Sequence, residues 1–299
     1  MIHSSPKKGT FILGLGMAKA GTTWLFDFLD GHPQVRMGFE KEMHILHAPE
    51  YGSYVRSFWH IPWRKFGGRF WVKEQAIRAW YRTDWNRYFD YFASRLESDA
   101  KLTGDLSPSN QTMSIESMVR VREEFRKREI RVLSVFIARD PVDRLLSDVR
   151  YSQRILERSR YRTPSTKGDK ELFLDSLKLG ANSLAGAPET ARRMNTAFNE
   201  QDRMILLHEE LFQQETIDRL TDSAGISRKE ASVSRKVNAA PERAVLPEGA
   251  RRAAAGLLAS TYEWAAGQFG RSRILALWPN AKFVLADDAA HPPRDWRHA

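Results

Sequence analysis

A short loop near the N-terminus combines the residue types that proteins use to bind phosphate. The loop runs from Gly16 to Thr23, between a short apolar run and a stretch with helical apolar periodicity. We therefore expect it to join a buried strand to a helix. Backbone N–H groups at a helix start point toward a bound anion, and glycine lets that backbone approach the anion closely. Lys19 adds a compact positive charge and Thr22 adds a hydroxyl donor, so the loop is a candidate phosphate site.

The order of residues in this loop differs from that of nucleotide triphosphatases. Their motif is G-x-x-x-x-G-K-[ST], with the lysine directly after the second glycine. Here Thr22 follows Gly21, and Lys19 precedes Gly21 by two residues. Lys19 therefore does not occupy the position from which a lysine holds the outer phosphates of ATP. A plain strand-to-helix turn is the alternative interpretation of the loop.

Arg139 and Ser147 are a second candidate phosphate contact. Arg139 directly follows the clearest apolar run, 131–138, and Asp140 with Pro141 is typical of a helix start. Two helical turns span about 7.2 residues, so Ser147 returns close to the face of the helix start. A guanidinium and a hydroxyl could then converge on one phosphate. A helix cap beside a surface arginine is the alternative.

These residues need a scaffold to position them, and the apolar pattern predicts one. Short apolar runs predict strands at 11–15, 35–37, 102–105, 131–138 and 204–208. Apolar periodicity predicts helices at 24–29, 114–129, 142–156, 189–199, 216–224 and 248–268. Polar composition predicts loops at 159–170 and 232–241. The alternation predicts a single α/β domain, residues 1–299, with a mainly parallel central sheet flanked by helices.

The composition restricts the chemistry further. The 299 residues include no cysteine, which excludes disulfides, thiolate metal sites, iron–sulfur clusters and a catalytic cysteine. A net charge of +10 is compatible with an anionic ligand, with nucleic acid or with a membrane surface. No apolar run approaches the roughly 18 residues of a membrane span, so no transmembrane segment is expected.

Two motifs resemble those of a known enzyme family. Lys19-Ala20-Gly21-Thr22-Thr23-Trp24-Leu25 resembles the 5′-phosphosulfate loop of the PAPS-dependent sulfotransferase superfamily. The segment 139–147 is similar to its 3′-phosphate motif, and 235–238 resembles the loop that closes over the nucleotide. The resemblance implies a P-loop-like sulfotransferase fold. It also implies transfer of a sulfuryl group from 3′-phosphoadenosine 5′-phosphosulfate (PAPS) to an acceptor hydroxyl.

The resemblance implies roles for individual residues. Lys19 would contact the oxygen that bridges phosphate and sulfate, and Arg139 with Ser147 would bind the 3′-phosphate. The other expected donor contacts, with the 5′-phosphate or elsewhere on the nucleotide, are Ala20, Gly21, Thr22, Thr23, Trp24, Arg235 and Lys236. No metal is expected, because this chemistry relies on positioning and on neutralising charge.

The reaction needs a base for the acceptor hydroxyl, and the segment 41–44 supplies candidates. It resembles the Lys-Glu-x-His stretch of glycan (heparan-sulfate-like) sulfotransferases, whose glutamate is the base. By that resemblance Glu42 is the expected base, His44 a second catalytic candidate, and Lys41 a group that orients donor or acceptor. Asp105 resembles a second acidic segment of the site. A solvated carboxylate is the alternative for Glu42, and a packed histidine for His44.

Residues 48–100 are the expected acceptor-binding region. The stretch 51–92 is much richer in aromatic residues than the 11% of the whole chain, and basic residues are interleaved. One interpretation is a helical insertion whose aromatic side chains form a core. The other is an acceptor-binding wall, where aromatic rings stack on a sugar or lipid and cations hold an anionic headgroup. The expected acceptor is therefore a glycan, a lipid or another small molecule, and peripheral membrane contact is compatible with it.

Two other functions stay open. A nucleotide kinase or ATPase would use a similar sheet, but the position of Lys19 argues against it. A non-enzymatic nucleic-acid-binding protein would explain the charge, but no nucleic-acid-binding module is recognisable. Golgi sulfotransferases carry an N-terminal anchor and usually cysteines, and this chain has neither. We therefore expect a bacterial-type, cytoplasmic enzyme with no nucleic-acid partner.

Overall fold

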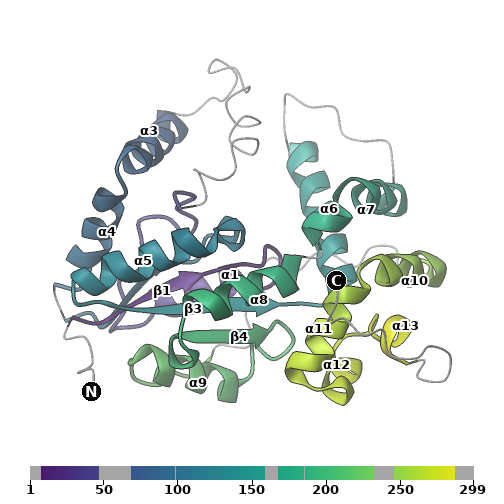
Figure 1. Cartoon of the computed structure of the whole chain (residues 1–299). Helices are drawn as coiled ribbons and strands as arrows, with labels where there is room; N and C mark the ends of the chain where they lie inside the picture. The colour runs from purple at the N-terminus through teal and green to yellow at the C-terminus, as the bar shows by residue number, and fades with distance from the viewer. Residues whose placement is uncertain are drawn as a thin grey trace. The chain divides into compact units, whose positions relative to one another are not determined.

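The computed structural model describes residues 8–46, 69–97, 99–158, 168–184, 186–231 and 246–286 (Figure 1). The chain divides into two compact units, each formed by two segments of the sequence. The first unit comprises Met1–Ala138 and Thr190–Ala239, and the second comprises Arg139–Glu189 and Ala240–Ala299. The expected loop at 232–241 and most of the one at 159–170 lie outside the described residues.

A four-stranded parallel sheet forms the centre of the first unit. Its strands are β1 (Thr10–Gly14), β2 (Leu102–Asp105), β3 (Arg131–Ala138) and β4 (Arg203–Leu207), in the order β2-β1-β3-β4. Phe11 of β1 is paired with Thr103 on one side and with Val132 on the other. β1 and β2 are buried throughout, as both faces of a parallel sheet usually are, so their strands read as short apolar runs. The predicted α/β fold with a parallel sheet flanked by helices is confirmed.

The parallel arrangement brings polar residues from distant parts of the sequence to one edge. The carboxyl ends of parallel strands all lie at the same edge of a sheet, where α/β proteins bind ligands. The loop 16–21 follows β1, Asp105 ends β2, and His208 follows β4. The sheet therefore presents the glycine loop and these two side chains on the same side.

The prediction of a strand at 35–37 is wrong. Only Val35 forms a bridge, to Leu102, next to the edge of the sheet. The side-chain hydroxyl of Thr103 donates to the carbonyl oxygen of Arg36 at 2.7 Å. Because a side chain and not a backbone N–H satisfies this carbonyl, the ladder does not continue.

The first unit also contains helices, most of which flank the sheet. These are α1 (Thr22–Asp30), α3 (Arg69–Thr83), α4 (Trp85–Ser94), α5 (Ile115–Lys127), α9 (Gln214–Ala224) and most of α8 (Gly186–Ala197). Figure 1 shows α5 running alongside the sheet. Its buried Phe125 stacks on Phe11 of β1, with ring centroids 4.1 Å apart. Two short 3-10 helices, Pro108–Thr112 and Glu200–Asp202, complete this unit.

The aromatic side chains of α4 belong to the core. Trp85, Tyr88, Phe89 and Phe92 are all buried, and their spacing places them on one face of the helix. The rings of Tyr88 and Phe92 pack edge-to-face with the ring of Phe11 in β1, at centroid distances of 6.2 and 4.9 Å. This part of the aromatic stretch thus matches the interpretation as a packed helical insertion. Residues 47–68 lie outside the described residues.

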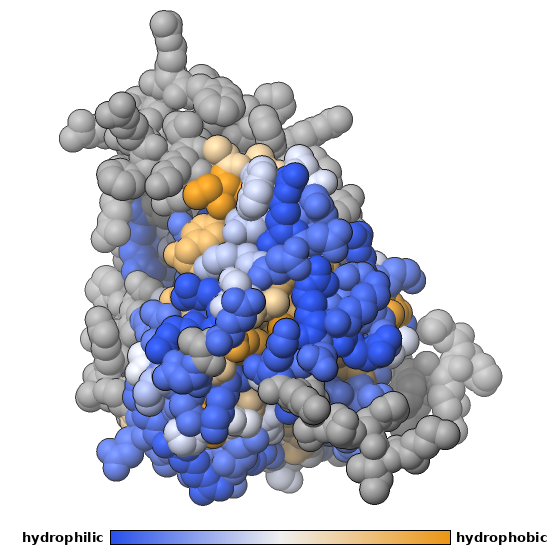
Figure 2. All heavy atoms as spheres, turned by 90° about the vertical axis from the view of Figure 1, so that its left-hand side faces the viewer, coloured by the Kyte–Doolittle hydropathy of each residue, from blue (hydrophilic) through white to orange (hydrophobic). Residues whose placement is uncertain are grey.

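Two aromatic residues, Phe39 before the insertion and Trp80 in its helix α3, stay at the surface. Phe39 is 43% exposed and Trp80 is 53% exposed. Figure 2 shows one face of the molecule, which is mostly hydrophilic with small hydrophobic areas. In the described parts of the chain, no helix is both long and apolar enough to cross a membrane.

The second unit is helical. It contains α6 (Pro141–Arg158), α7 (Asp169–Leu184), α10 (Glu248–Leu257), α11 (Ala259–Phe269), α12 (Arg271–Leu277) and α13 (Lys282–Leu285). The single helix expected at 248–268 is wrong, because the chain leaves helical geometry at Leu258. Leu258 is fully buried, so the bend places its side chain in the interior of the unit. The helix α7 was not expected; its Phe173 and Leu177 are buried one helical turn apart.

Candidate active site

The glycine loop has a backbone that ordinary residues disfavour. Gly21 is the N-cap of α1 and has a φ of 97°, and Lys19 has a φ of 65°. A Cβ atom added to Gly21 would lie 2.7 Å from Cδ2 of Leu211 and 3.1 Å from Nδ1 of His208. Glycine is therefore required here for both conformation and space. The helix then begins at Thr22, so the predicted order of strand, loop and helix is confirmed.

The first backbone N–H groups of α1 follow directly after this loop. The first N–H groups of a helix have no acceptor within the helix, and the helix dipole favours an anion near them. Trp24, expected near the nucleotide, is buried, and its ring stacks on Phe28 at 5.7 Å and meets Phe212 edge-on at 5.0 Å. Ala20 is also fully buried. The loop is thus anchored on its apolar side and can offer N–H and hydroxyl groups on the other.

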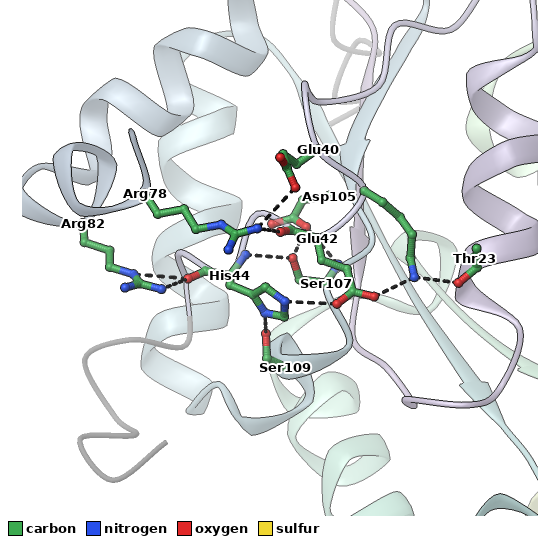
Figure 3. A network of polar contacts seen from close by, with 10 residues as sticks. Thr23, Glu40, Glu42, His44, Arg78, Arg82, Asp105, Ser107 and Ser109 are labelled. Atoms are coloured by element: carbon green, nitrogen blue, oxygen red, sulfur yellow. Dashed lines mark hydrogen bonds and ion pairs between the residues drawn. The ribbon is translucent and has the colours of Figure 1, made fainter. Parts of the chain in front are cut away.

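Lys41 connects this loop to the candidate base (Figure 3). Its Nζ atom donates to Oγ1 of Thr23 at 2.6 Å and lies 2.6 Å from Oε1 of Glu42. Thr23 is the second residue of α1, where a bound phosphate is expected. A single ammonium group therefore lies between the donor loop and the carboxylate.

On its other side, the carboxylate of Glu42 contacts the imidazole of His44 (Figure 3). Oε2 of Glu42 lies 3.0 Å from Nε2 of His44, and Nδ1 of His44 lies 2.8 Å from Oγ of Ser109. Burial alone would raise the pKa of Glu42. The hydrogen bonds and charges of His44 and Lys41 outweigh burial and lower the pKa of Glu42 from 4.5 to about 2. Glu42 is therefore an ionised, firmly held carboxylate over the whole physiological pH range.

Asp105 lies behind this pair and is fully buried. Its Oδ1 accepts from Oγ of Ser107 at 2.5 Å and from the Ser107 backbone N–H at 2.8 Å, and its Oδ2 accepts from the Tyr88 hydroxyl at 2.9 Å. Burial raises the pKa of Asp105, although these hydrogen bonds oppose the shift. Oγ of Ser107 in turn accepts from the backbone N–H of His44 at 3.1 Å. Asp105 thus supports the segment that carries His44.

Two arginines of α3 hold the same segment from the other side. Arg82 donates from Nη2 and Nε to the carbonyl oxygen of His44, at 2.6 and 3.2 Å. Arg78 donates from Nη2 to the carbonyl oxygen of Glu42 at 3.1 Å and to the carboxylate of Glu40 at 3.2 Å. Our sequence analysis did not identify either arginine as part of the site. Their four-residue spacing places them on one helix face, but nothing in the sequence specifies a backbone partner.

Arg139 and Ser147, the expected 3′-phosphate contacts, lie in the second unit. Arg139 directly precedes α6 and Ser147 lies on α6, and both are half-buried. Asp140 caps the helix as predicted, since its Oδ1 accepts from the Val142 backbone N–H at 3.0 Å. The expected contacts Arg235 and Lys236 lie outside the described residues.

The same aspartate links the start of α6 to the C-terminal helices of its unit. Oδ1 of Asp140 accepts from the Tyr262 hydroxyl at 2.8 Å, and Oδ2 accepts from the backbone N–H and Nδ2 of Asn280 at 3.0 and 3.1 Å. Burial and the charge of Asp143 raise the pKa of Asp140, against the effect of these donors. This network fixes the backbone next to Arg139.

The chain was compared with known proteins at three levels. No family model and no curated protein sequence matches it. The structure is similar to the crystal structure of a sulfotransferase from Alicyclobacillus acidocaldarius, with a TM-score of 0.56 at 15% identity, over 88% of this chain and 96% of that chain.

Two further solved structures match less well. The sulfotransferase domain from the Synechococcus PCC 7002 olefin synthase has a TM-score of 0.41 at 15% identity, over 77% of both chains. The sulfotransferase domain from the curacin biosynthetic pathway has a TM-score of 0.42 at 12% identity, over 76% of both chains. The fold similarity therefore rests on the Alicyclobacillus protein. The similarity shows that this chain shares its overall fold with that sulfotransferase.

Proposed function

We propose that the protein is a PAPS-dependent sulfotransferase that transfers a sulfuryl group to an acceptor hydroxyl. The observation that carries the proposal is the continuous chain of contacts Thr23–Lys41–Glu42–His44, which joins the start of α1 to a half-buried carboxylate and the imidazole beside it. An anion-binding loop beside a base is what group transfer from a phosphosulfate requires. The similarity in fold to a sulfotransferase supports the same conclusion.

In this proposal the glycine loop and α1 bind the 5′ end of the donor. The backbone of Gly21 and the first residues of α1 bind the 5′-phosphate, and Lys19 stabilises the oxygen that leaves. Arg139 and Ser147 bind the 3′-phosphate, and Arg235 and Lys236 are further contacts. A guanidinium is suited to this role, because it binds phosphate through two parallel hydrogen bonds.

The transfer itself is an in-line displacement at sulfur. The acceptor oxygen forms a bond to sulfur while the bond from sulfur to the 5′-phosphate oxygen breaks, and 3′-phosphoadenosine 5′-phosphate (PAP) leaves. Glu42 takes the acceptor proton. A carboxylate of low pKa suffices, because the hydroxyl becomes much more acidic as its oxygen bonds to sulfur. Each carboxylate oxygen accepts more than one hydrogen bond, so Glu42 can receive the acceptor hydroxyl while it keeps Lys41 and His44.

The acceptor is proposed to be a glycan or a lipid with a free hydroxyl. The segment 41–44 supports a subtype like the glycan sulfotransferases, through its resemblance to their motif. The exposed rings of Phe39 and Trp80 are suited to stack on a sugar or to contact a lipid, and the guanidinium of Arg87 lies 4.6 Å from the Trp80 ring centroid.

A thermal-shift experiment tests the donor. A ligand that binds only the native state stabilises it by mass action, by about 2.7 kcal/mol at a hundredfold excess over its Kd. We expect PAP to raise the melting temperature more than ATP with Mg²⁺ or a DNA oligonucleotide does. A larger shift with ATP would favour a nucleotide kinase, and a larger shift with the oligonucleotide would favour a nucleic-acid-binding protein. Transfer of labelled sulfate from PAPS to fractionated glycan and lipid extracts then identifies the acceptor.

A further inference from the structure

We propose that His208 is a positioning residue that holds the anion-binding loop in its ligand-binding conformation. It does so by donating a hydrogen bond from its ring to the backbone of Ala20. The inference deepens the proposed function, since it rests on the loop binding the 5′-phosphate of the donor. The segment 203–211 resembles a late strand and acidic turn of bacterial sulfotransferases, but that resemblance assigns no role to this histidine.

His208 is well placed to hold the loop. Its Nδ1 lies 3.0 Å from the carbonyl oxygen of Ala20, although 187 residues separate the two in the sequence. Its own backbone N–H donates to the carbonyl oxygen of Ala138 at 2.8 Å, which extends the pairing of β4 with β3. The histidine therefore stands on the rigid edge of the sheet, and the loop is attached to it.

The imidazole ring is also fixed by packing. The ring of Phe212 meets it edge-on, with centroids 5.3 Å apart and an interplanar angle of 86°. A Cβ atom added at Gly21 would lie 3.1 Å from Nδ1. The ring thus lies directly against the glycine that starts α1, and it has little room to turn away.

The contact sets the direction of the next backbone N–H. The peptide bond between Ala20 and Gly21 is trans, so the carbonyl of Ala20 and the N–H of Gly21 point in opposite directions. A donor that fixes the carbonyl toward His208 therefore turns the Gly21 N–H away from it. That N–H comes just before those of the first turn of α1, which are expected to receive the anion.

The loop needs such an external contact. Lys19 and Gly21 both have positive φ values, of 65° and 97°. This region of backbone conformation is unfavourable for residues other than glycine. A short segment of this kind keeps one conformation only when its surroundings determine it. The hydrogen bond from His208 and the packing of Leu211 against Gly21 are two such constraints.

The chemistry of the contact predicts which substitutions preserve it. A backbone carbonyl oxygen only accepts, so Nδ1 of His208 must carry the proton. The side-chain amide of asparagine can place an N–H close to the position of Nδ1. The longer glutamine side chain places its amide near the position of Nε2, from which it does not reach Ala20. Asparagine should therefore preserve the loop, and alanine and glutamine should not.

Calorimetry with matched ligands tests the proposal. PAP carries both phosphates, whereas adenosine 3′-monophosphate lacks the 5′-phosphate that the loop binds. We expect His208→Ala and His208→Gln to weaken PAP binding about tenfold. The Gly21 N–H would no longer be held toward the charged 5′-phosphate, and one hydrogen bond to that phosphate would be lost. His208→Asn should stay within about threefold of the original protein. Binding of adenosine 3′-monophosphate should be the same in all four proteins.

Several outcomes would overturn the proposal. They are unchanged PAP binding in His208→Ala, equal losses for both nucleotides, or equal behaviour of the Asn and Gln variants. Urea unfolding of each variant separates a folding defect from a loss of binding, and the stable Asn variant keeps the comparison valid. If the original protein does not bind PAP, the sulfotransferase proposal fails. In that case the affinity of the original protein and the same variants for inorganic pyrophosphate tests the role of His208. If none of them binds pyrophosphate, or if all bind it equally, the role of His208 is rejected.

Discussion

Oε2 of Glu42 lies 3.0 Å from Nε2 of His44, while Nζ of Lys41 lies 2.6 Å from Oε1 of the same carboxylate. The carboxylate is therefore held from two sides, with one partner that also contacts the donor loop and one that contacts Ser109. This arrangement favours Glu42 over Asp105 as the base, because Asp105 is fully buried and its two oxygens accept from Ser107 and Tyr88. In the proposed mechanism His44 orients Glu42.

Replacement of Glu42 by glutamine tests the base directly. Glutamine keeps the shape of the side chain but does not accept the acceptor proton. We expect kcat with the identified acceptor to fall by about 10²- to 10⁴-fold, the usual effect of losing a general base. The affinity for PAP, measured by calorimetry, should change little. Full turnover in Glu42→Gln would show that another group takes the proton.

The low pKa of Glu42 also predicts how stability depends on pH. The pKa of Glu42 falls from 4.5 in the unfolded chain to about 2 in the folded protein, so the folded state favours the ionised form. Its contribution is complete above about pH 4.5 and is lost as the pH falls toward about 2. The difference in unfolding free energy between the original protein and Glu42→Gln should therefore shrink as the pH falls.

Urea unfolding of both proteins at several values between about pH 3 and about pH 6 measures this difference. The side chain of Glu42 is 32% exposed, so solvent screening makes the effect smaller than the pKa alone suggests. A difference that stays constant over this range would mean that Lys41 and His44 do not lower the pKa of Glu42 in solution.

The sheet could be predicted from the sequence because burial leaves a local signal. The strands β1, β3 and β4 begin within one residue of the predicted runs, since a strand buried on both faces is a short apolar run. The break at Leu258 has no such signal. It depends on what the leucine packs against in the folded unit. Gly256 lies close to the break, but Gly249 and Gly267 lie inside helices that continue, so a glycine alone does not locate the break.

The candidate site could be predicted only in part, for a similar reason. Glu42 and Lys19 have side chains and neighbours that match a chemical role. Arg82 and His208 act on backbone carbonyl oxygens of residues far away in the sequence, His44 and Ala20. Every residue has such a carbonyl, so no pattern of residue types identifies these partners before the fold is known.

Replacement of Arg82 by alanine should reduce turnover without reducing donor binding. Arg82 donates two hydrogen bonds to the carbonyl oxygen of His44, so its loss frees the segment that carries Glu42. Hydrogen bonds from a charged group contribute about 1.5–3 kcal/mol, and we expect kcat to fall roughly tenfold or more. Arg126→Ala is the matched control, because Arg126 is an exposed arginine whose hydrogen bond goes to Glu123 on its own helix. Equal kinetics in the two variants would refute the positioning role of Arg82.

Replacement of Arg139 by alanine should weaken the binding of PAP about 10- to 100-fold. The effect should depend on the 3′-phosphate, so adenosine 5′-monophosphate, which lacks it, should bind equally to both proteins. Ser147→Ala should show the same selectivity with a smaller loss, because a neutral hydroxyl contributes less than a guanidinium. Isothermal calorimetry with the two nucleotides provides the comparison. Equal losses for both nucleotides would assign Arg139 to another part of the ligand or to folding.

Replacement of Gly21 by alanine should abolish donor binding and destabilise the first unit. The added Cβ would lie 2.7 Å from Cδ2 of Leu211, and the φ of 97° is unfavourable for alanine. We expect a loss of about 1–3 kcal/mol in the free energy of unfolding, as for other strained backbone positions. PAP should give no thermal shift, because the start of α1 moves relative to the loop.

Gly256→Ala is the control for this substitution. Gly256 lies in α10, has no atom within 4 Å of the added Cβ, and is followed by the exposed Leu257. Alanine in a helix is favoured over glycine by about 0.5–1 kcal/mol, so this variant should be slightly more stable. Its response to PAP should be unchanged. A Gly21→Ala protein that keeps its thermal shift with PAP would show that the loop tolerates a side chain, and the loop would then not be the 5′-phosphate site.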